Sequence, residues 1–443
     1  MLDPARAEAH RRLLRTPAGR PPRETEHGRG LAEDLFLGVR RHAGTLDSVA
    51  GTFTKSAVGG LEPEMREALR LGVFQLLFHA DTPAPLIVAS TVELAGKSAK
   101  RRGFLNAVLR RLVEAFRHEP TPPGPLRSRR HVRTLPGRAA AFDRDVLPDP
   151  SADLERYLAT QYALRRDFVA ELRRELPLEI DALLEACNHP LPLALRVNRK
   201  ATTREAAEKA LADAGVRVLR RFGDVLEVEI PGAVEALAPL QAGLVTVQDV
   251  VPAETAAFLG AAPSEKILDL CAGVGGKTAL LAEIAQRQGG AASILACDVQ
   301  AVRLAKLQEN VKRLGVAGVS TKLLKLDGSD VPGGPFDRVL IDVPCSNTGV
   351  LMKRVEARHR LAPDDVARVT ALQATLLERG AKVTRPGGVL VYATCSLLAD
   401  ENRRVVGAFL NRKPGAYELE EERLRYPHRT GRDGGYMARL RRL

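Results

Sequence analysis

This chain lacks the features of a membrane protein and of a disulfide-stabilised secreted protein. No apolar run approaches the roughly 18 residues that a membrane span needs. Only five cysteines occur, and no two are spaced as C-x-x-C, which argues against a disulfide framework and against a zinc site. The first residues are partly acidic and contain no apolar segment, unlike a signal peptide. We therefore expect a cytoplasmic protein with no membrane partner and no bound metal.

Length and charge limit the remaining choices. At 443 residues the chain is too long for one ordinary core, so two to four domains are expected. The composition, 45% hydrophobic and 27% charged, is that of a globular protein. A net charge of +13 favours a polyanionic partner, because each neutralised phosphate releases counterions. A solvated, arginine-rich surface would account for the same charge, so charge alone leaves both interpretations open.

The first 119 residues carry the pattern of packed helices. Leu69 and Val73, and again Leu105 and Leu109, recur at the spacing of one helix face, which predicts a compact all-helical domain. A basic cluster lies between two of the helices, and it fits either an RNA-facing patch or the usual charge of helix ends. It consists of Lys97, Lys100, Arg101 and Arg102.

Residues 120–150 are expected to be a linker. Seven prolines between positions 120 and 150 forbid a continuous helix, and six arginines add positive charge without an apolar period. Such a segment could lie along a phosphate backbone or serve as a plain tether. The arginines are Arg127, Arg129, Arg130, Arg133, Arg138 and Arg144.

The rest of the chain divides into a small α/β module at residues 151–249 and a larger α/β domain at residues 250–443. In the larger part strands and helices alternate, which predicts a parallel sheet with helices on both faces. Expected strands lie at residues 267–270, 294–298, 322–327, 338–342 and 389–394. Ligands of such sheets bind beyond the carboxyl ends of the strands. Five candidate residues fall there: Asp269, Asp298, Asp327, Asp342 and Cys395.

A glycine turn follows the first of these strands, between Cys271 and Lys277. A phosphate loop needs glycine at 271, where Cys stands, and a dinucleotide fingerprint needs glycine at 278, where Thr stands. What remains is a tight turn whose helix N-terminal N–H groups can bind a carboxylate. S-adenosylmethionine fits this geometry, with Asp298 at the ribose hydroxyls and Asp327 beside the adenine.

Two cysteines follow two other expected strands, within Pro344-Cys345-Ser346 and Thr394-Cys395-Ser396. Cytosine C5 is too weak a nucleophile to take a methyl group unaided. A thiolate that adds to C6 makes C5 nucleophilic, and loss of the C5 proton later expels the enzyme. Asp342 precedes Cys345 by three residues and could hold N3 and the exocyclic amine of the base. Either cysteine alone would be read as a small apolar filler, but the pair beside a cofactor turn favours catalysis.

These motifs resemble the RNA 5-methylcytosine methyltransferase family, and most strongly its bacterial 16S rRNA enzymes with an N-terminal NusB-like domain. Residues 69–78 and 103–110 are similar to the NusB-like domain, and residues 195–198, 248–249 and 434–440 to segments that flank the catalytic core. The resemblance implies an all-α N-terminal domain, a small α/β module and a Rossmann-like catalytic domain. It also implies that Cys395 is the nucleophile and that Cys345 assists product release.

The resemblance further implies which residues contact S-adenosylmethionine. They are Cys271, Ala272, Gly273, Val274, Gly275, Gly276, Lys277, Asp298, Asp327 and Asp342. Two departures stand out. Gly273-Val274 replaces the family's Ala-Pro in the turn, and the segment after Gly349 loses a proline and an aromatic residue.

We therefore expect a monomeric, S-adenosylmethionine-dependent RNA (cytosine-C5)-methyltransferase whose partner is 16S rRNA. The same chemistry on tRNA or another RNA is the nearest alternative, because the catalytic motifs do not select the substrate. A non-catalytic RNA-binding scaffold is an alternative of another class. It is supported by the altered turn and opposed by the two intact cysteines.

Overall fold

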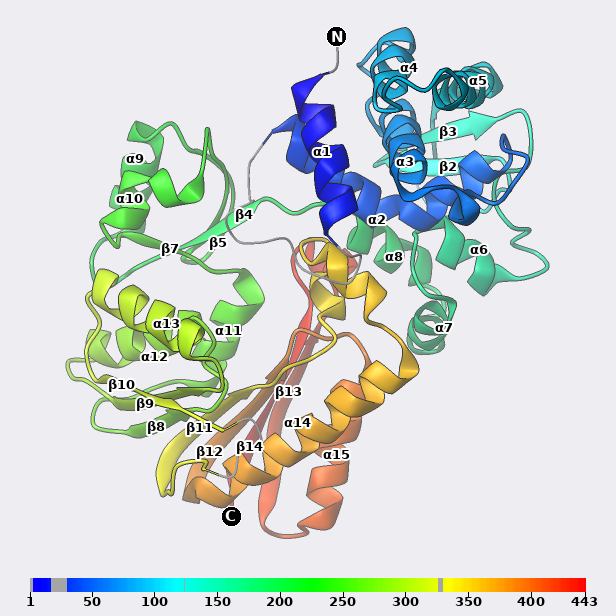
Figure 1. The fold of residues 1–443 in the computed structure, drawn as a ribbon. Coiled ribbons are helices and arrows are strands. Elements are labelled where there is room, and N and C mark those ends of the chain that lie inside the picture. Colours follow the sequence, from blue (N-terminus) through cyan, green and yellow to red (C-terminus); the bar gives the residue numbers. More distant parts are fainter. Residues whose placement is uncertain (1–2, 17–29, 123, 326–329) are drawn as a thin grey trace. The chain divides into compact units, whose positions relative to one another are not determined.

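The computed structural model describes residues 3–16, 30–122, 124–325 and 330–443. By its internal contacts the chain forms two compact units, which are described separately (Figure 1). The first comprises Met1–His189 together with Leu351–Leu361, and the second comprises Pro190–Val350 with Ala362–Leu443. No helix among the described residues is both long and apolar enough to cross a bilayer.

The first unit begins with packed helices. They are α1 (Pro4–Arg15), α2 (Leu31–Gly51), α3 (Pro63–Phe78), α4 (Ala84–Glu93) and α5 (Ala99–Ala115). Asp3 caps α1 by accepting a hydrogen bond from the Arg6 amide at 2.9 Å. The predicted apolar stripes are confirmed, because Leu69, Leu105 and Leu109 are each completely buried.

The expected linker contains regular structure instead. Strands β1 (Phe116–Pro120), β3 (Arg138–Phe142) and β2 (His131–Leu135) form an antiparallel sheet in that order. Pro136 falls in the turn between β2 and β3, where it removes no ladder hydrogen bond, so the prolines do not prevent pairing. Helices α6 (Leu154–Gln161), α7 (Arg166–Glu175) and α8 (Ile180–Asn188) follow and complete the first unit.

Most of the arginines between residues 120 and 150 are engaged by carboxylates of the same unit. Their ion pairs are Arg127–Asp181 at 2.6 Å, Arg129–Asp145 at 2.9 Å, Arg130–Asp145 at 3.1 Å, Arg133–Glu185 at 2.9 Å and Arg144–Asp143 at 2.8 Å. A phosphate backbone would have to compete with these partners. The prediction of a linker without regular structure is therefore wrong, because this stretch contains β2 and β3 and its arginines are mostly paired within the first unit.

A short piece of the later sequence belongs to the first unit. Within Leu351–Leu361 the 3₁₀ helix η5 (Val355–His359) is mostly buried. Arg358 donates to the carbonyl oxygens of Tyr162 at 3.1 Å and Cys187 at 2.7 Å, which lie at the C-terminal ends of α6 and α8. Carbonyls at a helix end lack intrahelical partners and carry partial negative charge, so a buried guanidinium suits them. This is the segment in which the family's proline and aromatic are replaced.

The second unit opens with a small module. Its four-stranded sheet has the order β5 (Arg217–Phe222), β6 (Val225–Glu229), β4 (Leu193–Val197) and β7 (Val245–Val247), with α9 (Arg204–Asp213) packed on it. The expected helices before β4 belong to the first unit, so the compact units do not divide the chain at residue 150.

A seven-stranded sheet forms the rest of the second unit. Its strand order is β10 (Val319–Leu323), β9 (Ser293–Asp298), β8 (Lys266–Asp269), β11 (Phe336–Asp342), β12 (Thr384–Thr394), β14 (Gly435–Arg442) and β13 (Tyr417–Arg425). The first five strands pair in parallel as expected. The sheet is nevertheless mixed, because β14 runs antiparallel to both β12 and β13.

Helices cover both faces of this sheet. Alternate residues of the central strands face opposite sides: Leu340 packs with α11 (Val250–Leu259) and α12 (Gly276–Arg287), whereas Ile341 packs with α14 (Pro363–Val383) and α15 (Arg403–Arg412). Figure 1 shows α14 and α15 side by side along the sheet. Both core-facing sets are apolar, as in a sheet buried between helical layers.

A buried ion pair connects the small module to the helix that follows the glycine turn. Arg196 of β4 pairs with Glu283 of α12, and both side chains are only 2% exposed. Glu283 also accepts from the Arg199 amide at 2.9 Å, and Arg196 donates to Gln248 at 2.5 Å. The pair thereby fixes the orientation of α12 and of the turn before it.

We expect Glu283→Ala to lower the free energy of unfolding by about 3–5 kcal/mol, because it leaves the Arg196 guanidinium buried without its counter-ion. Urea unfolding followed by circular dichroism measures the loss. The matched control is Glu229→Ala, which breaks the exposed pair with Arg217 and should cost less than about 1 kcal/mol. Equal losses in the two variants would contradict a structural role for the buried pair.

Candidate active site

The glycine turn connects β8 to α12 and requires glycine at its last position. Gly275 has φ +86°, and a Cβ there would lie 2.5 Å from Leu307 Cγ. Gly273 also adopts a positive φ of +56°, so glycine at this position suits the backbone. Ala272 is held by its amide, which donates to the Cys297 carbonyl at 2.8 Å, and the Val274 side chain is exposed.

The carboxylates of Asp269 and Asp298 accept hydrogen bonds that fix the turn and the start of the helix after it. Asp298 accepts from the Gly273 amide at 3.0 Å and from the Gln300 amide at 2.9 Å. Asp269 accepts from the Thr278 hydroxyl at 2.7 Å, and burial raises the pKa of Asp269 to about 6. Asp298 therefore lies against the turn, where a bound nucleoside would meet it. Asp327 lies outside the described residues.

The start of α12 offers donors for an anion. No side chain caps this helix, its first turn contains no acidic residue, and Gly276 is the first residue within it. Gln248 Nε2 is buried without a hydrogen-bond partner, and a Cβ on Gly276 would lie 3.6 Å from it. Amide groups at a helix N-terminus favour a carboxylate, so the turn fits the amino-acid end of S-adenosylmethionine.

The two cysteines meet because their strands are parallel neighbours. In the register of β11 and β12, Asp342 pairs with Ala393, so the residues that follow leave the sheet side by side. The Gly349 amide donates to the Cys395 carbonyl at 2.8 Å and ties the two loops together. The two thiols are close enough for Cys395 to influence the pKa of Cys345, and both residues are half-buried.

The hydrogen bond to Cys395, together with burial and the nearby Glu401 carboxylate, raises the pKa of Cys345 well above its usual range. Cys345 is therefore the protonated partner, and it donates toward Cys395. A donated hydrogen bond stabilises negative charge on the acceptor sulfur.

The backbone of Lys277 belongs to the glycine turn, but its side chain extends toward the two cysteines. Its ammonium is 2.5 Å from the Asp342 carboxylate, and it interacts electrostatically with Cys395. Burial opposes the charge of Lys277, but Asp342 and Cys395 outweigh burial and raise the pKa of Lys277. The structure thus brings together Cys395, Cys345, Asp342 and Lys277.

The other cysteines are poor nucleophiles. Burial raises the pKa of Cys187 and of Cys297 to about 12, and it raises the pKa of Cys271 well above its usual range. Since the thiolate is the reactive form, Cys271 stays a neutral thiol in the turn.

Sequence reasoning missed the side chains behind the two cysteine loops. Ser346, Ser396, Gln373 and Glu401 are all buried and form one hydrogen-bonded group. The available signal was the serine that follows each cysteine, but nothing in the sequence links either serine to Glu401.

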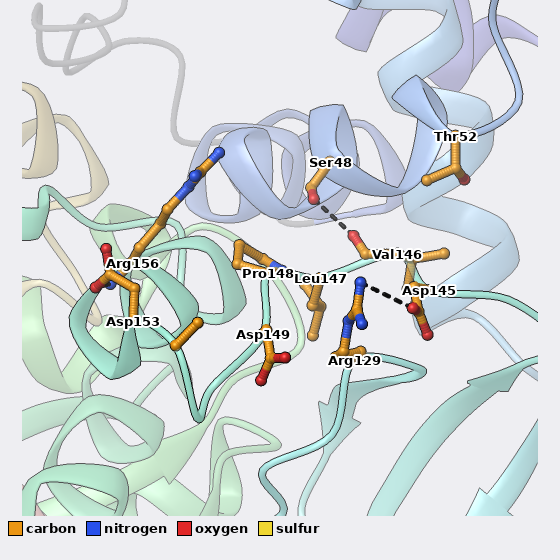
Figure 2. Close-up of a pocket in the computed structure, with 11 residues that line it drawn as sticks. Ser48, Thr52, Arg129, Asp145, Val146, Leu147, Pro148, Asp149, Asp153 and Arg156 are labelled. Carbon is orange, nitrogen blue, oxygen red and sulfur yellow. Dashed lines mark hydrogen bonds and ion pairs between the residues drawn. The ribbon is translucent and has the colours of Figure 1, made fainter.

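A separate cavity of about 430 Å³ lies in the first unit (Figure 2). Its polar groups are largely engaged with one another: Arg129 pairs with Asp145 at 2.9 Å, and the Ser48 hydroxyl donates to the Val146 carbonyl at 2.6 Å. It contains no cysteine and no histidine, so it offers none of the nucleophilic chemistry of the thiol pair. Among the described residues, no group of three or more His, Cys, Asp or Glu side chains could hold a metal ion.

A Rossmann-like sheet with a glycine turn after β8 is the architecture of an S-adenosylmethionine-dependent methyltransferase. Comparison with known families places the chain more closely. Residues 256–441 match 16S rRNA methyltransferase RsmB/F, residues 5–114 match the NusB family, and residues 168–235 match the ferredoxin-like domain of RsmF/B-like methyltransferases.

Individual relatives agree with these matches. The chain is 33% identical to ribosomal RNA small subunit methyltransferase B of Pseudomonas putida, over 94% of this chain and 91% of that protein. It is 31% identical to the enzyme of the same name from Erwinia tasmaniensis, over 93% and 90% of the two chains. The crystal structure of PH0851 shares the fold, with a TM-score of 0.73, 23% identity and 99% of each chain covered. The chain belongs to the RsmB/F family of 16S rRNA methyltransferases.

We expect Lys277→Met to slow alkylation of Cys395 by iodoacetamide at pH 7 on the order of tenfold, because the cation facing the thiolate is lost. Mass spectrometry of tryptic peptides reports each cysteine separately. Lys277→Arg keeps the charge and should react close to the wild-type rate, and Lys312→Met on exposed α13 (Ala301–Arg313) is the matched control. An unchanged rate in Lys277→Met would show that the ammonium does not activate Cys395.

Proposed function

We propose that this chain methylates C5 of a cytosine in 16S rRNA through a covalent bond between Cys395 and C6 of the base, and that it acts as a monomer. The observation that carries this proposal is that the Cys345 and Cys395 loops leave adjacent parallel strands side by side, tied by the Gly349 amide, with Lys277 of the glycine turn paired to Asp342 beside them. When bound, S-adenosylmethionine supplies the electrophilic methyl group. The residues placed to hold it are Cys271, Ala272, Gly273, Val274, Gly275, Gly276 and Asp298.

The proposed reaction begins at Cys395. Lys277 and the Cys345 thiol stabilise its thiolate, which adds to C6 and makes C5 nucleophilic. Asp342, which pairs with Lys277 at 2.5 Å, accepts a hydrogen bond from the exocyclic amine as the adduct forms. C5 then takes the methyl group.

Release depends on Cys345. Once Cys395 is bonded to carbon its negative charge is gone, so the largest influence that keeps Cys345 protonated disappears. Cys345 can then lose its proton to solvent and take the C5 proton from the methylated base. The electron pair of the C5–H bond forms the C5–C6 double bond, the C6–S bond breaks, and Cys395 leaves as a thiolate. The proton given to solvent is the single proton that the overall reaction releases.

RNA contact in the first unit is proposed for the outer face of α5. Lys100, Arg110 and Arg111 are exposed there, and Lys97 is exposed just before the helix. Two members of the expected cluster are less available, since Arg101 pairs with Glu62 and Arg102 with Glu93. Phosphate neutralisation by the four exposed cations would make RNA affinity depend on salt.

We expect S-adenosylmethionine to bind with an affinity that Asp298→Ala weakens about tenfold, because the variant loses both a carboxylate beside the ligand and the acceptor that shapes Gly273. Isothermal titration calorimetry measures the change. Asp213→Ala, at the end of α9, is the matched control and should leave affinity unchanged. Saturable ATP binding without S-adenosylmethionine binding would reject the cofactor assignment.

The two cysteines should fail at different stages. With 16S rRNA and S-adenosylmethionine, Cys395→Ala should form no covalent complex, whereas Cys345→Ala should accumulate a protein–RNA adduct that survives a denaturing gel. Cys187→Ala is the control and should turn over normally, because Cys187 is buried in α8. The opposite pattern would reverse the two roles, and full turnover by both variants would exclude thiolate catalysis. Adducts formed with tRNA in place of 16S rRNA would reassign the substrate.

A further inference from the structure

A buried carboxylate lies directly behind the two cysteine loops. Glu401, in the 3₁₀ helix η6 (Ala399–Glu401), is completely buried. One of its oxygens accepts from the hydroxyls of Ser396, at 2.6 Å, and Ser346. The other accepts from the Ser346 amide at 2.9 Å and from Gln373 Nε2 at 2.9 Å. Its four main acceptor positions are thus filled.

These donors come from the residues that follow the two cysteines. Ser346 follows Cys345 in the sequence and Ser396 follows Cys395, so one carboxylate is hydrogen-bonded to both cysteine loops. The two serine hydroxyls also lie 3.2 Å apart, within hydrogen-bond distance. A displacement of the Glu401 carboxylate would therefore move both serines, and with them the cysteines that precede them in the sequence.

Further hydrogen bonds fix the loop backbones around this carboxylate. Gln373 donates to the Pro344 carbonyl at 2.9 Å, and Thr348 accepts from the Leu397 amide at 2.8 Å. Asn402 donates to the Ser396 carbonyl at 2.9 Å, and the Tyr392 hydroxyl donates to the Glu401 carbonyl at 2.6 Å. The network leaves little freedom in the separation of the two loops.

The cost of this arrangement indicates a role beyond stability. All four donors to the Glu401 carboxylate are neutral groups, and a carboxylate without a cation in a dry interior is expensive to bury. A well-packed apolar side chain would fill the same space more cheaply. What an apolar residue could not do is connect two loops from different strands at one point.

We propose that Glu401 is a positioning residue for the thiol pair: through Ser346 and Ser396 it fixes the separation of the Cys345 and Cys395 loops. The catalytic part of this inference rests on the proposed function. The geometric part does not, because it concerns the separation of two thiols in the free protein.

Cross-linking by the short bifunctional thiol reagent dibromobimane tests the geometry in the full-length protein without RNA or cofactor. We expect wild type to form the Cys345–Cys395 cross-link readily. The double variant Ser346→Ala/Ser396→Ala and the single variant Glu401→Asp should form it at least about tenfold more slowly. The double variant loses the two hydroxyl groups that bind the carboxylate, and Glu401→Asp shortens the side chain so that its carboxylate no longer reaches both serines. Glu401→Gln keeps the size of the side chain and can keep its hydrogen bonds, so it should cross-link close to the wild-type rate. Ser320→Ala on β10 is the matched control.

The same variants separate positioning from folding and from binding. With circular dichroism and S-adenosylmethionine affinity unchanged, Glu401→Asp should lower kcat about tenfold or more and leave KM for RNA near its wild-type value, since misplacement by about 1 Å is costly to a reaction. Glu401→Gln should restore kcat. Wild-type cross-linking rates in both Glu401→Asp and the double variant would overturn the proposal. Cross-linking that depends on Glu401 in a protein without methyl transfer would instead reject the proposed function.

Discussion

The parallel pairing of β11 with β12 is the constraint on which the active site depends. Its register sets Asp342 opposite Ala393, and both chains leave the sheet at the same edge. Cys345 and Cys395 are 50 positions apart in the sequence, yet this register brings their loops side by side. A one-residue slip would turn every side chain of the strand to the other face, and the apolar packing of Leu340 and Ile341 on opposite layers opposes such a slip.

Charged side chains of opposite sign lie near the two sulfur atoms. Lys277 approaches Cys395 from the glycine turn, and Glu401 influences Cys345 from behind the loops. A cation favours ionisation of the thiol it faces, and a carboxylate opposes it. The two cysteines therefore face different charges although each ends a strand and precedes a serine. The cation beside Cys395 gives a physical basis for assigning the attack to that thiol.

Ionic and polar contacts also join segments that are far apart in the sequence. Arg196 and Glu283 join the small module to the helix of the cofactor turn, so the turn is supported by residues from well upstream. Arg358, after the Cys345 loop in sequence, is buried in the first unit at the ends of α6 and α8. Most arginines between residues 120 and 150 form ion pairs with carboxylates of the same unit, so RNA phosphates would have to compete for them.

Local pattern alone determined much of this protein. The helical stripes through Leu69 and Leu105, the parallel strands ending at Asp298 and Asp342, and the glycine turn all follow from periodicity or short-range backbone geometry. The mixed edge of the sheet did not, since β14 pairs with β12 across a long stretch of sequence. The β2–β3 hairpin did not either, because the sequence around it is rich in proline and arginine and shows no apolar alternation. Tertiary structure alone placed Lys277 against Asp342 and Glu401 against Ser346 and Ser396. Residue type shows that a side chain can donate or accept a hydrogen bond, whereas only folding decides which partner, distant in sequence, comes within reach.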